Sequence, residues 1–358
     1  MKHAITNKHS EFIEKTELLS PRGWVSVSEI SPGDEVMTMD LDGNMSYDSI
    51  AKTRSTHIAH QMIHFHSGRI DLTINPDGCI PIYKYKPTGS CTENIIVSAE
   101  SIKKLRGIQG GNLSWNGIIP PSKFSLPSTK SVDLADKNDQ AKSVPIDAWL
   151  KLYGLYMRKG SSYNTNKNNV SDSSSARIGF PHSGKNSDKD ADKTCKLLKS
   201  CGFSPIKNHD KSHTVSCYDS DLALYFKDVS ETFPMKLDTS YLKYSSKYLS
   251  SLFYSYLKAE NVFALKKHFK TKNLREAELI QELILKSFGM ITQIHRSPDK
   301  GYYYISFDGN KASDTIMLGE KETIDYSGKV YEVETEKNNI LLVRQNSAIG
   351  WIGTEASI

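Results

Sequence analysis

Thr16–Trp24 (TELLSPRGW) begins a strand-like region that continues to Tyr85. Within it, Glu35–Met39 leads into the turn Asp40–Asn44, and Met62–His66 is followed by Ser and Gly. Short apolar runs bounded by Gly, Asp and Asn are typical of strands joined by tight turns. This spacing predicts a curled fold made of short strands.

A second strand-like region lies near the other end of the chain. It consists of Val330–Glu336 (VYEVETE), Asn339–Asn346 (NILLVRQN) and Trp351–Thr354 (WIGT). Between the two regions, Ser125–Val144 is rich in Ser, Lys and Asp and predicts a loop or linker.

The periodicity changes after this linker, where helix-like and strand-like runs alternate. The expected elements are Trp149–Tyr156, Ala176–Phe180, Asp190–Ser200, His213–Tyr218, Asp221–Phe226, Ser246–Lys258, Leu274–Phe288 and Tyr302–Phe307. These elements form two successive αββα-like units, which indicates an internal repeat.

The composition excludes several classes of protein. The 358 residues include five scattered cysteines without CxxC spacing, which argues against a zinc site or a disulfide framework. No apolar run approaches the ~20 residues of a membrane span, and Met1–Glu14 has no signal-like apolar stretch. We therefore expect no membrane partner and an intracellular, cytoplasmic location, with association with a virion as the alternative. The net charge of +5 permits nucleic-acid contact without requiring it.

Four histidines gather in the first strand-like region: His57, His60, His64 and His66. Residues two apart on a strand face the same way, so His64 and His66 are expected on one side. Because no Cys, Asp or Glu joins them at ligand spacing, we expect strand histidines rather than a metal site.

The two strand-like regions together resemble the N- and C-terminal blocks of the Hint fold, the all-β domain shared by inteins and hedgehog autoprocessing proteins. The resemblance implies a Hint-like domain split into residues 1–145 and 315–358, with residues 146–314 inserted.

The residues at the splicing positions do not match the reactions of the family. Splicing needs a Cys or Ser nucleophile about five residues before the position of Thr16, which falls on Glu11, with Ser10 one place away. A carboxylate cannot make the required acyl shift. The family's Thr-x-x-His block corresponds to Asn75 through Gly78, so Asn75 replaces the Thr and Gly78 the His. Glycine offers no proton donor.

The C-terminal block also departs from the family. Inteins end in an Asn that cyclises, followed by a Cys, Ser or Thr acceptor. Here Thr354 stands at the Asn position and Glu355 at the acceptor. If Thr354 is instead taken as the acceptor, Gly353 stands at the Asn position, and glycine has no side-chain amide that could cyclise. The resemblance therefore implies a domain that does not splice.

The inserted repeat resembles the LAGLIDADG homing endonucleases. The nine-residue motif corresponds to Leu152–Gly160 and then to Phe253–Asn261. The family packs its two motif helices side by side, with an acidic residue at each helix base that holds a divalent metal. Those positions carry Lys159 and Glu260 here. Hard cations need carboxylate oxygens, and an ammonium repels them, so cleavage is expected to be lost or weak.

Other acidic residues could still hold the metal that cleavage needs. Asp147 or Asp172 could replace the missing acid, and Glu260 alone is a weak candidate for a metal ligand. We expect no cofactor, with Mg²⁺ needed only if endonuclease activity survives. Lys266, Lys267 and Lys270 lie in the densest basic run and are the candidate DNA contacts, although a solvated basic loop explains them equally well.

These expectations give an α+β protein in which a split Hint-like β-domain encloses a two-fold pseudo-symmetric αββα LAGLIDADG-like domain. The function expected is that of a degenerate relative, inactive in splicing and cleavage and more a binding protein than an enzyme. It would bind double-stranded DNA or other proteins as a component of a mobile element, phage or virus. The alternatives are an active or nicking homing endonuclease and a purely structural protein of a viral assembly.

Overall fold

The computed structural model describes residues 9–66, 70–85, 91–102, 108–109, 113–127, 141–164, 176–183, 186–208, 213–232, 237–257, 269–298, 300–305, 316–317 and 320–354. The chain divides into two compact units. Unit 1 comprises Met1–Gly117 with Leu265–Ile358, and unit 2 comprises Ile118–Ala264. The fold is mixed α+β with a large, mainly antiparallel sheet, as the sequence predicted at that level. The boundaries of the insert, residues 146–314, stay a prediction.

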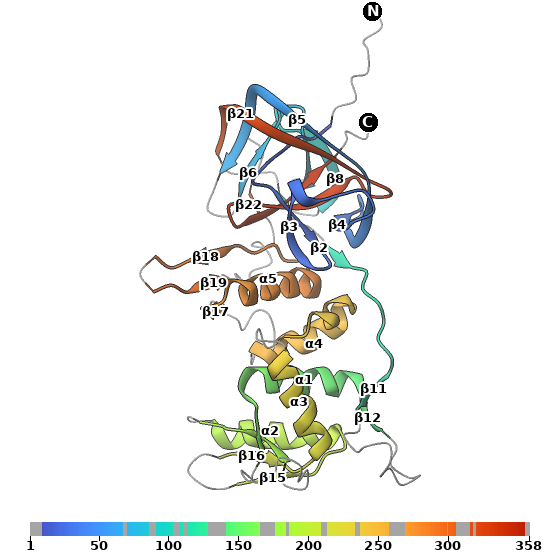
Figure 1. Ribbon diagram of the computed structural model, residues 1–358, viewed down its shortest axis with the longest axis vertical. Helices are drawn as coiled ribbons and strands as arrows, with labels where there is room; N and C mark the ends of the chain where they lie inside the picture. The colour runs from blue at the N-terminus through green and yellow to red at the C-terminus, as the bar shows by residue number, and fades with distance from the viewer. Residues whose placement is uncertain are drawn as a thin grey trace, which may run out of the picture. The chain divides into compact units, whose positions relative to one another are not determined.

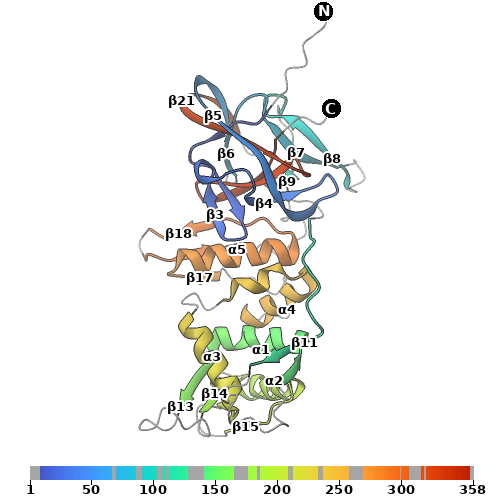
Figure 2. The ribbon, with the colours of Figure 1, turned by 45° about the vertical axis from the view of Figure 1, so that its right-hand side comes forward.

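Among the described residues, unit 1 contains a 12-stranded sheet in the order β21-β1-β6-β5-β4-β22-β23-β7-β8, with β2, β3 and β10 paired beside this path. Figures 1 and 2 show strands from the two ends of the sequence, blue and red, side by side in it. The strands are β1 (Phe12–Ile13), β2 (Glu17–Ser20), β3 (Gly23–Ser26), β4 (Glu35–Met39), β5 (Asn44–His66), β6 (Asp71–Ile74), β7 (Cys79–Tyr85), β8 (Cys91–Ser98), β10 (Ser114–Trp115), β21 (Glu320–Thr335), β22 (Ile340–Gln345) and β23 (Ala348–Gly353). The short helix η1 (Val27–Glu29) follows β3, and β9 (Ile108–Gln109) pairs with β20 (Ile316–Met317).

β5 and β21 form a long antiparallel ribbon. They pair from His66 opposite Glu320 to Ile50 opposite Thr335. The expectation of short strands was wrong here, because β5 alone has 23 residues. Residues 51–61 are mostly exposed, so they lack the inward and outward alternation by which a strand is recognised in sequence. Backbone pairing with β21 keeps this stretch extended.

The hairpin of β22 and β23 lies in the core, and every residue of both strands is buried. Its turn residues Asn346 and Ser347 have φ angles of 47° and 73°, the left-handed conformation that suits a two-residue hairpin turn. At the end of β23, the Thr354 carbonyl accepts a hydrogen bond of 3.1 Å from the Ser10 N–H. The first and last described segments are therefore neighbours.

Unit 1 also contains α5 (Leu274–Phe288), whose bounds are those predicted from the sequence. The Asn273 side chain caps its first turn, and Gly289 ends it with a left-handed φ of 67°. The helix packs on a three-stranded antiparallel sheet. The strands of this sheet, in spatial order, are β17 (Phe269–Thr271), β19 (Tyr303–Ile305) and β18 (Ile294–Arg296).

α5 contacts the large sheet through buried charges. Lys286, one of the most deeply buried large side chains, lies with its Nζ 2.6 Å from Glu282 Oε1 and 3.1 Å from the Tyr47 hydroxyl. The same ammonium is 4.6 Å from the Tyr47 ring centre and 4.4 Å from that of Trp115. Burial raises the pKa of Tyr47, and the Glu282 carboxylate raises it further, so this phenol stays protonated.

A second buried ion pair lies on the same helix. Arg344 of β22 binds both carboxylate oxygens of Glu17 at 2.6 and 2.7 Å, and its Nη1 lies 2.6 Å from Glu278 Oε1. Its guanidinium also lies 4.7 Å from the centre of the Trp24 ring. Burial alone would lower the pKa of Arg344, but the two carboxylates raise it, so the guanidinium stays charged.

Unit 2 combines helices with a four-stranded sheet in the order β13-β14-β16-β15. The ends of the expected linker form a hairpin instead, because β11 (Lys123–Leu126) pairs with β12 (Lys142–Pro145), while residues 128–140 lie outside the described part. The other elements are α1 (Ile146–Lys159), β13 (Ser161–Asn164), β14 (Ala176–Phe180), α2 (Ser187–Ser200), β15 (Pro205–Lys207), β16 (Val215–Cys217), α3 (Ser220–Thr232), η4 (Thr239–Lys243) and α4 (Ser246–Leu257).

The helices α1 and α4 carry the two motif segments and pack against each other. A Cβ atom on Gly154 would lie 2.6 Å from the Leu252 carbonyl oxygen, so the close approach requires glycine. Ser251 Oγ donates to Asp147 Oδ1 at 2.7 Å, and Ser255 Oγ donates to the Lys151 carbonyl at 2.5 Å. The small residues thus let the backbones meet and link them by hydrogen bonds.

Among the described helices, none is both long and apolar enough to cross a membrane.

We predict that Lys286→Met destabilises the protein by about 3–5 kcal/mol, because it leaves the Glu282 carboxylate buried without its partner. Urea unfolding measures the change. The matched control is Lys151→Met, whose pair with Asp147 has the same spacing and the same 2.6 Å separation but exposed side chains, and it should cost no more than about 0.5 kcal/mol. Equal effects of the two variants would show that the Lys286 pair does not hold α5 to the sheet.

Candidate functional site

Ser10 lies where the first and last described segments meet, and it is 1% exposed. Its hydroxyl donates to the Gly353 carbonyl and accepts a hydrogen bond of 3.0 Å from the Cys79 N–H. Cys79 in turn pairs with Gly353 across β7 and β23. The hydroxyl is therefore held by backbone groups on both sides, and neither of these partners is a base.

Asn75 links the residues on either side of Ser10. Its Nδ2 donates to the His9 carbonyl at 2.9 Å, and its Oδ1 accepts from the Glu11 N–H at 2.9 Å. The amide side chain thus fixes the backbone around the His9–Ser10 peptide bond. Sequence reasoning placed the nucleophile position on Glu11, whereas in the structure Ser10 is the side chain that points to Gly353 and Cys79.

Gly78 lies in the turn that follows Asn75, and its N–H donates to the Asn75 carbonyl at 2.9 Å. A Cβ atom at this position would lie 2.3 Å from Ile74 Cγ1 and 2.6 Å from Asn75 Oδ1. No histidine side chain can therefore stand here unless Ile74 and Asn75 move.

Thr354 is 2% exposed, and both its N–H and its hydroxyl donate to the Asn339 carbonyl, at 2.7 and 3.4 Å. The structure thus brings Glu11, Asn75, Gly78 and Thr354 into one neighbourhood around Ser10. Glu355 lies outside the described residues.

The Glu11 side chain is bound elsewhere. Its Oε2 lies 3.1 Å from His60 Nε2. Burial raises the pKa of Glu11, the neighbouring His60 opposes this change, and Glu332 adds to it. Glu11 and His60 form a local pair that does not contact the Ser10 hydroxyl.

His64 forms hydrogen bonds with two carboxylates, which the spacing of residues in the sequence did not predict. Its Nδ1 lies 2.9 Å from Glu322 Oε1 and its Nε2 lies 2.9 Å from Asp71 Oδ1. Burial alone would lower the pKa of His64, but hydrogen bonds to Asp71 and Glu322 raise it overall. The rings of His64 and His66 are 5.3 Å apart, as expected for one side of a strand. In the described part of the chain, no cluster of three or more His, Cys, Asp or Glu side chains could hold a metal ion.

At the end of α1, Lys159 Nζ lies 2.7 Å from Nδ1 of His182, which is buried. Asp147 is twelve residues earlier on the same helix, roughly 18 Å away at the helical rise, so it cannot supply a carboxylate at the helix base. Glu260 and Asp172 lie outside the described residues, and the expected meeting of Lys159 with Glu260 stays a prediction.

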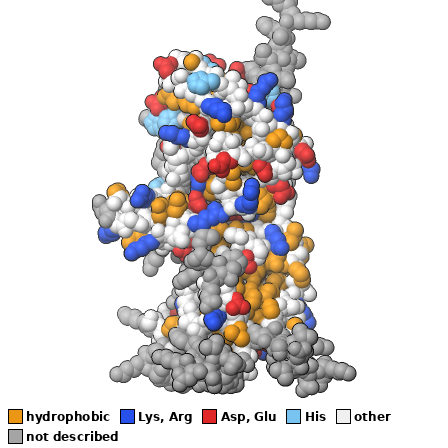
Figure 3. Space-filling model, viewed as in Figure 1, with side chains coloured by type: hydrophobic (Ala, Val, Ile, Leu, Met, Phe, Trp, Pro, Cys, Tyr) orange, Lys and Arg blue, Asp and Glu red, His pale blue; other side chains and the backbone are white. Residues whose placement is uncertain are grey.

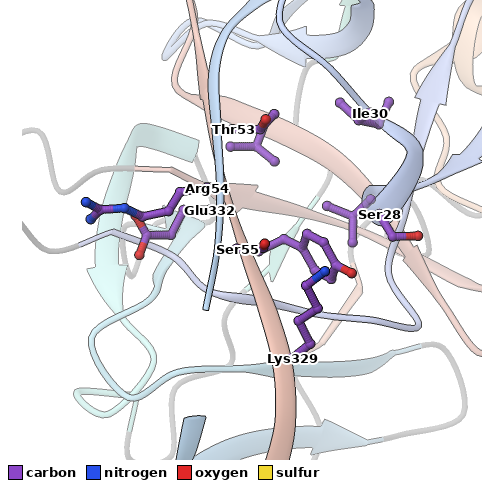
Figure 4. Close-up of a pocket in the computed structure, with 10 residues that line it drawn as sticks. Ser28, Ile30, Thr53, Arg54, Ser55, Lys329 and Glu332 are labelled. Atoms are coloured by element: carbon purple, nitrogen blue, oxygen red, sulfur yellow. The ribbon is translucent and has the colours of Figure 1, made fainter. Parts of the chain in front are cut away.

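An open pocket of about 190 Å³ lies between η1 and the β5–β21 ribbon. Figure 4 shows Ser28, Ser55 and Lys329 on one side of the ribbon, with Arg54 and Glu332 directed away from them. The lining combines the cations Arg54 and Lys329 and the carboxylate of Glu332 with hydroxyl-bearing and apolar side chains, which include Thr53 and Ile30. This combination selects no particular ligand.

The sheet of β17, β19 and β18 has one face on α5 and one face toward solvent. In the register of the sheet, Lys270, Tyr304 and His295 lie opposite one another on the outer face. Lys272 directly follows β17 and Tyr302 directly precedes β19, and both belong to the same face because the Tyr302 ring contacts the ammonium groups of Lys270 and Lys272. We call these five residues the Lys–Tyr face.

The contacts within the Lys–Tyr face join cations to aromatic rings. Lys270 Nζ lies 4.2 Å from the Tyr302 ring centre and Lys272 Nζ lies 5.3 Å from it. The rings of His295 and Tyr304 are stacked, with their centres 5.1 Å apart. Figure 3 shows Lys and Arg side chains on the hairpin of β18 and β19, at the left of the view.

Sequence reasoning identified Lys270 but missed the rest of this face. The missed signal was the alternation of Lys270 and Lys272 with the run Tyr302–Tyr304, which places two cations and two rings on one side of neighbouring strands. Lys266 and Lys267 lie outside the described residues.

Comparisons with known proteins find structural likeness without sequence relatives. No family model matches the chain, and no curated protein matches it. The structure is similar to the homing endonuclease I-DmoI in complex with DNA and Mn, with 17% identity over 46% of this chain and 90% of that chain and a TM-score of 0.33. It is also similar to a bacterial intein-like domain from Clostridium thermocellum, with 19% identity over 28% of this chain and 64% of that chain and a TM-score of 0.22.

A splice-inactive variant of the AceL NrdHF class 3 split intein gives a further match, with 19% identity over 29% of this chain and 66% of that chain and a TM-score of 0.24. The structural matches thus fall in the same two classes, LAGLIDADG endonucleases and intein-like domains, that the sequence resembles.

We predict that the purified chain keeps its full mass during long incubation with a thiol or with hydroxylamine, which cleaves esters. The reason is that the Ser10 hydroxyl is bound to backbone groups, with no base among its partners in the described part of the chain. Intact-mass measurement checks this, with Ser10→Ala as the control. A product cut between His9 and Ser10 that disappears in Ser10→Ala would contradict the prediction.

Proposed function

We propose that this chain is a DNA-binding protein built on an intein-like scaffold that no longer splices. The finer architecture proposed is the one expected from the sequence, a split Hint-like domain around a two-fold αββα LAGLIDADG-like domain. The observation that carries the binding function is the Lys–Tyr face, where Lys270 and Lys272 are exposed on the outer side of a sheet that α5 supports from behind.

Loss of splicing is supported by the neighbourhood of Ser10. A histidine at Gly78 would require Ile74 and Asn75 to move, and among the described residues the Ser10 hydroxyl bonds to backbone groups. Loss of cleavage is supported by Lys159, whose ammonium contacts His182 and cannot ligate magnesium. We therefore assign the function to the binding surface.

The basic side chains favour nucleic acid over an uncharged partner. Lysine ammonium groups on an open surface bind phosphates and release the counterions that surround them, which gives binding a steep dependence on salt. Lys270 lies on the edge strand β17 and Lys272 directly follows that strand, so both can contact one phosphate backbone.

We predict that a fluorescently labelled DNA binds at low salt and that its affinity falls steeply between about 50 and 200 mM salt. The double variant Lys270→Ala and Lys272→Ala should weaken binding and reduce the slope of log affinity against log salt by about two, because about one counterion is released per phosphate contact. Fluorescence anisotropy with duplex and single-stranded oligonucleotides measures both quantities.

The matched control removes the same charge from α2 through Lys196→Ala and Lys199→Ala, which are also exposed. This control should leave affinity and slope nearly unchanged. No binding to either DNA at low salt would overturn the proposal in favour of a structural role, and equal losses in both double variants would place binding away from the Lys–Tyr face. Magnesium-dependent nicking of the duplex would instead identify an active endonuclease.

A further inference from the structure

We infer that the Lys–Tyr face takes single-stranded DNA, with bases stacked on Tyr302 and Tyr304 and phosphates bound by Lys270 and Lys272. This inference rests on the proposed function and specifies the form of DNA that is recognised.

The tyrosine rings and the lysines of the Lys–Tyr face come from different strands. Tyr302 and Tyr304 come from β19 and its preceding turn, in the middle of the sheet, whereas Lys270 and Lys272 come from the β17 edge. His295 stacks on Tyr304 from the opposite edge strand, β18. A nucleic-acid strand that crosses this face can therefore place bases over the centre and its backbone along the β17 edge.

The spacing of the two tyrosines favours unstacked bases. Residues two apart on a strand are roughly 6.5 Å apart, about twice the 3.4 Å step between stacked nucleotides in B-DNA. Each ring can therefore hold a base of its own only if the bases have separated from one another. In a duplex the faces of the bases are covered by their neighbours, so a tyrosine ring on this sheet has nothing to stack on.

The side-chain types on this face also favour single-stranded DNA. Duplex sequence is read mainly by Arg, Asn and Gln, which bond in pairs to base edges in the major groove. The Lys–Tyr face has none of these three types and instead has two phenol rings and an imidazole. Aromatic rings on an open sheet, flanked by cations, are the arrangement by which single-stranded nucleic acid is bound.

The ammonium contacts on Tyr302 are compatible with stacking. A cation over an exposed aromatic ring contributes only ~0.5–1 kcal/mol, so a base can replace it. The displaced Lys270 and Lys272 ammonium groups then lie beside the phosphates of the same strand, where they bind more strongly.

A second contact between a cation and a tyrosine ring occurs in unit 2. Arg177 of β14 donates to the Tyr218 hydroxyl at 2.9 Å, its guanidinium lies 5.7 Å from the ring centre, and Tyr218 is 52% exposed. The buried residues of β14 are Ala176, Ile178, Gly179 and Phe180, so Arg177 is the one side chain of that strand that is not buried. A tyrosine ring with an adjacent cation thus occurs beside the four-stranded sheet of unit 2 as well as beside the three-stranded sheet of unit 1.

The test compares a labelled single-stranded oligonucleotide with its duplex by anisotropy at low salt, using the full chain. We expect the single strand to bind at least tenfold more tightly. Tyr302→Ala should weaken single-strand binding roughly 5- to 100-fold, whereas Tyr302→Phe, which keeps the ring, should bind like the unmodified protein. Duplex binding should change little in either variant.

Tyr248→Ala provides the matched control, because Tyr248 also lies beside a lysine, 5.6 Å from Lys247 Nζ, but on helix α4. It should leave affinity unchanged, and circular dichroism checks that each variant is folded. A duplex that binds as tightly as the single strand, or equal losses in Tyr302→Ala and Tyr302→Phe, would overturn this inference while leaving DNA binding intact. Absence of binding to both DNAs would overturn the proposed function itself.

Discussion

The buried charges between α5 and the large sheet are the interactions on which the rest of unit 1 depends. Arg344 binds Glu17 on its own sheet and Glu278 on the helix, and Lys286 binds Glu282 beside Tyr47. Buried charges are costly unless they are paired and hydrogen-bonded, so a packing of helix and sheet that separates the partners is strongly disfavoured. Since α5 also supports the three-stranded sheet, the same contacts hold the Lys–Tyr face on a rigid base.

The hydrogen bonds around Ser10 join the first described segment of the chain to the last. Asn75 fixes the backbone on both sides of Ser10, and the hydroxyl joins the first described segment to Gly353 at the end of β23. The partners of this hydroxyl are backbone groups, which cannot take its proton. These contacts link the first and last described segments.

Local patterns predicted the regular elements well. The bounds of α5 follow from the cap Asn273, the apolar spacing and Gly289, and β14 follows from a short apolar run. The length of β5 did not follow, because residues 51–61 are extended only through pairing with β21, about 270 residues later in the sequence. In the candidate site, Asn75, Gly78 and Thr354 were found by resemblance. The nucleophile position was assigned to Glu11 with Ser10 one place away, and a shift of one residue reverses which side chain faces inward.

The central claim is that the Lys–Tyr face holds unpaired DNA, and photochemical crosslinking tests it most directly. A single-stranded oligonucleotide with bromodeoxyuridine is irradiated with the full chain, and mass spectrometry of the digested protein locates the crosslinked residue. The account predicts crosslinks at Tyr302 or Tyr304. Crosslinks confined to other surfaces, with none in β19 or the turn before it, would contradict it.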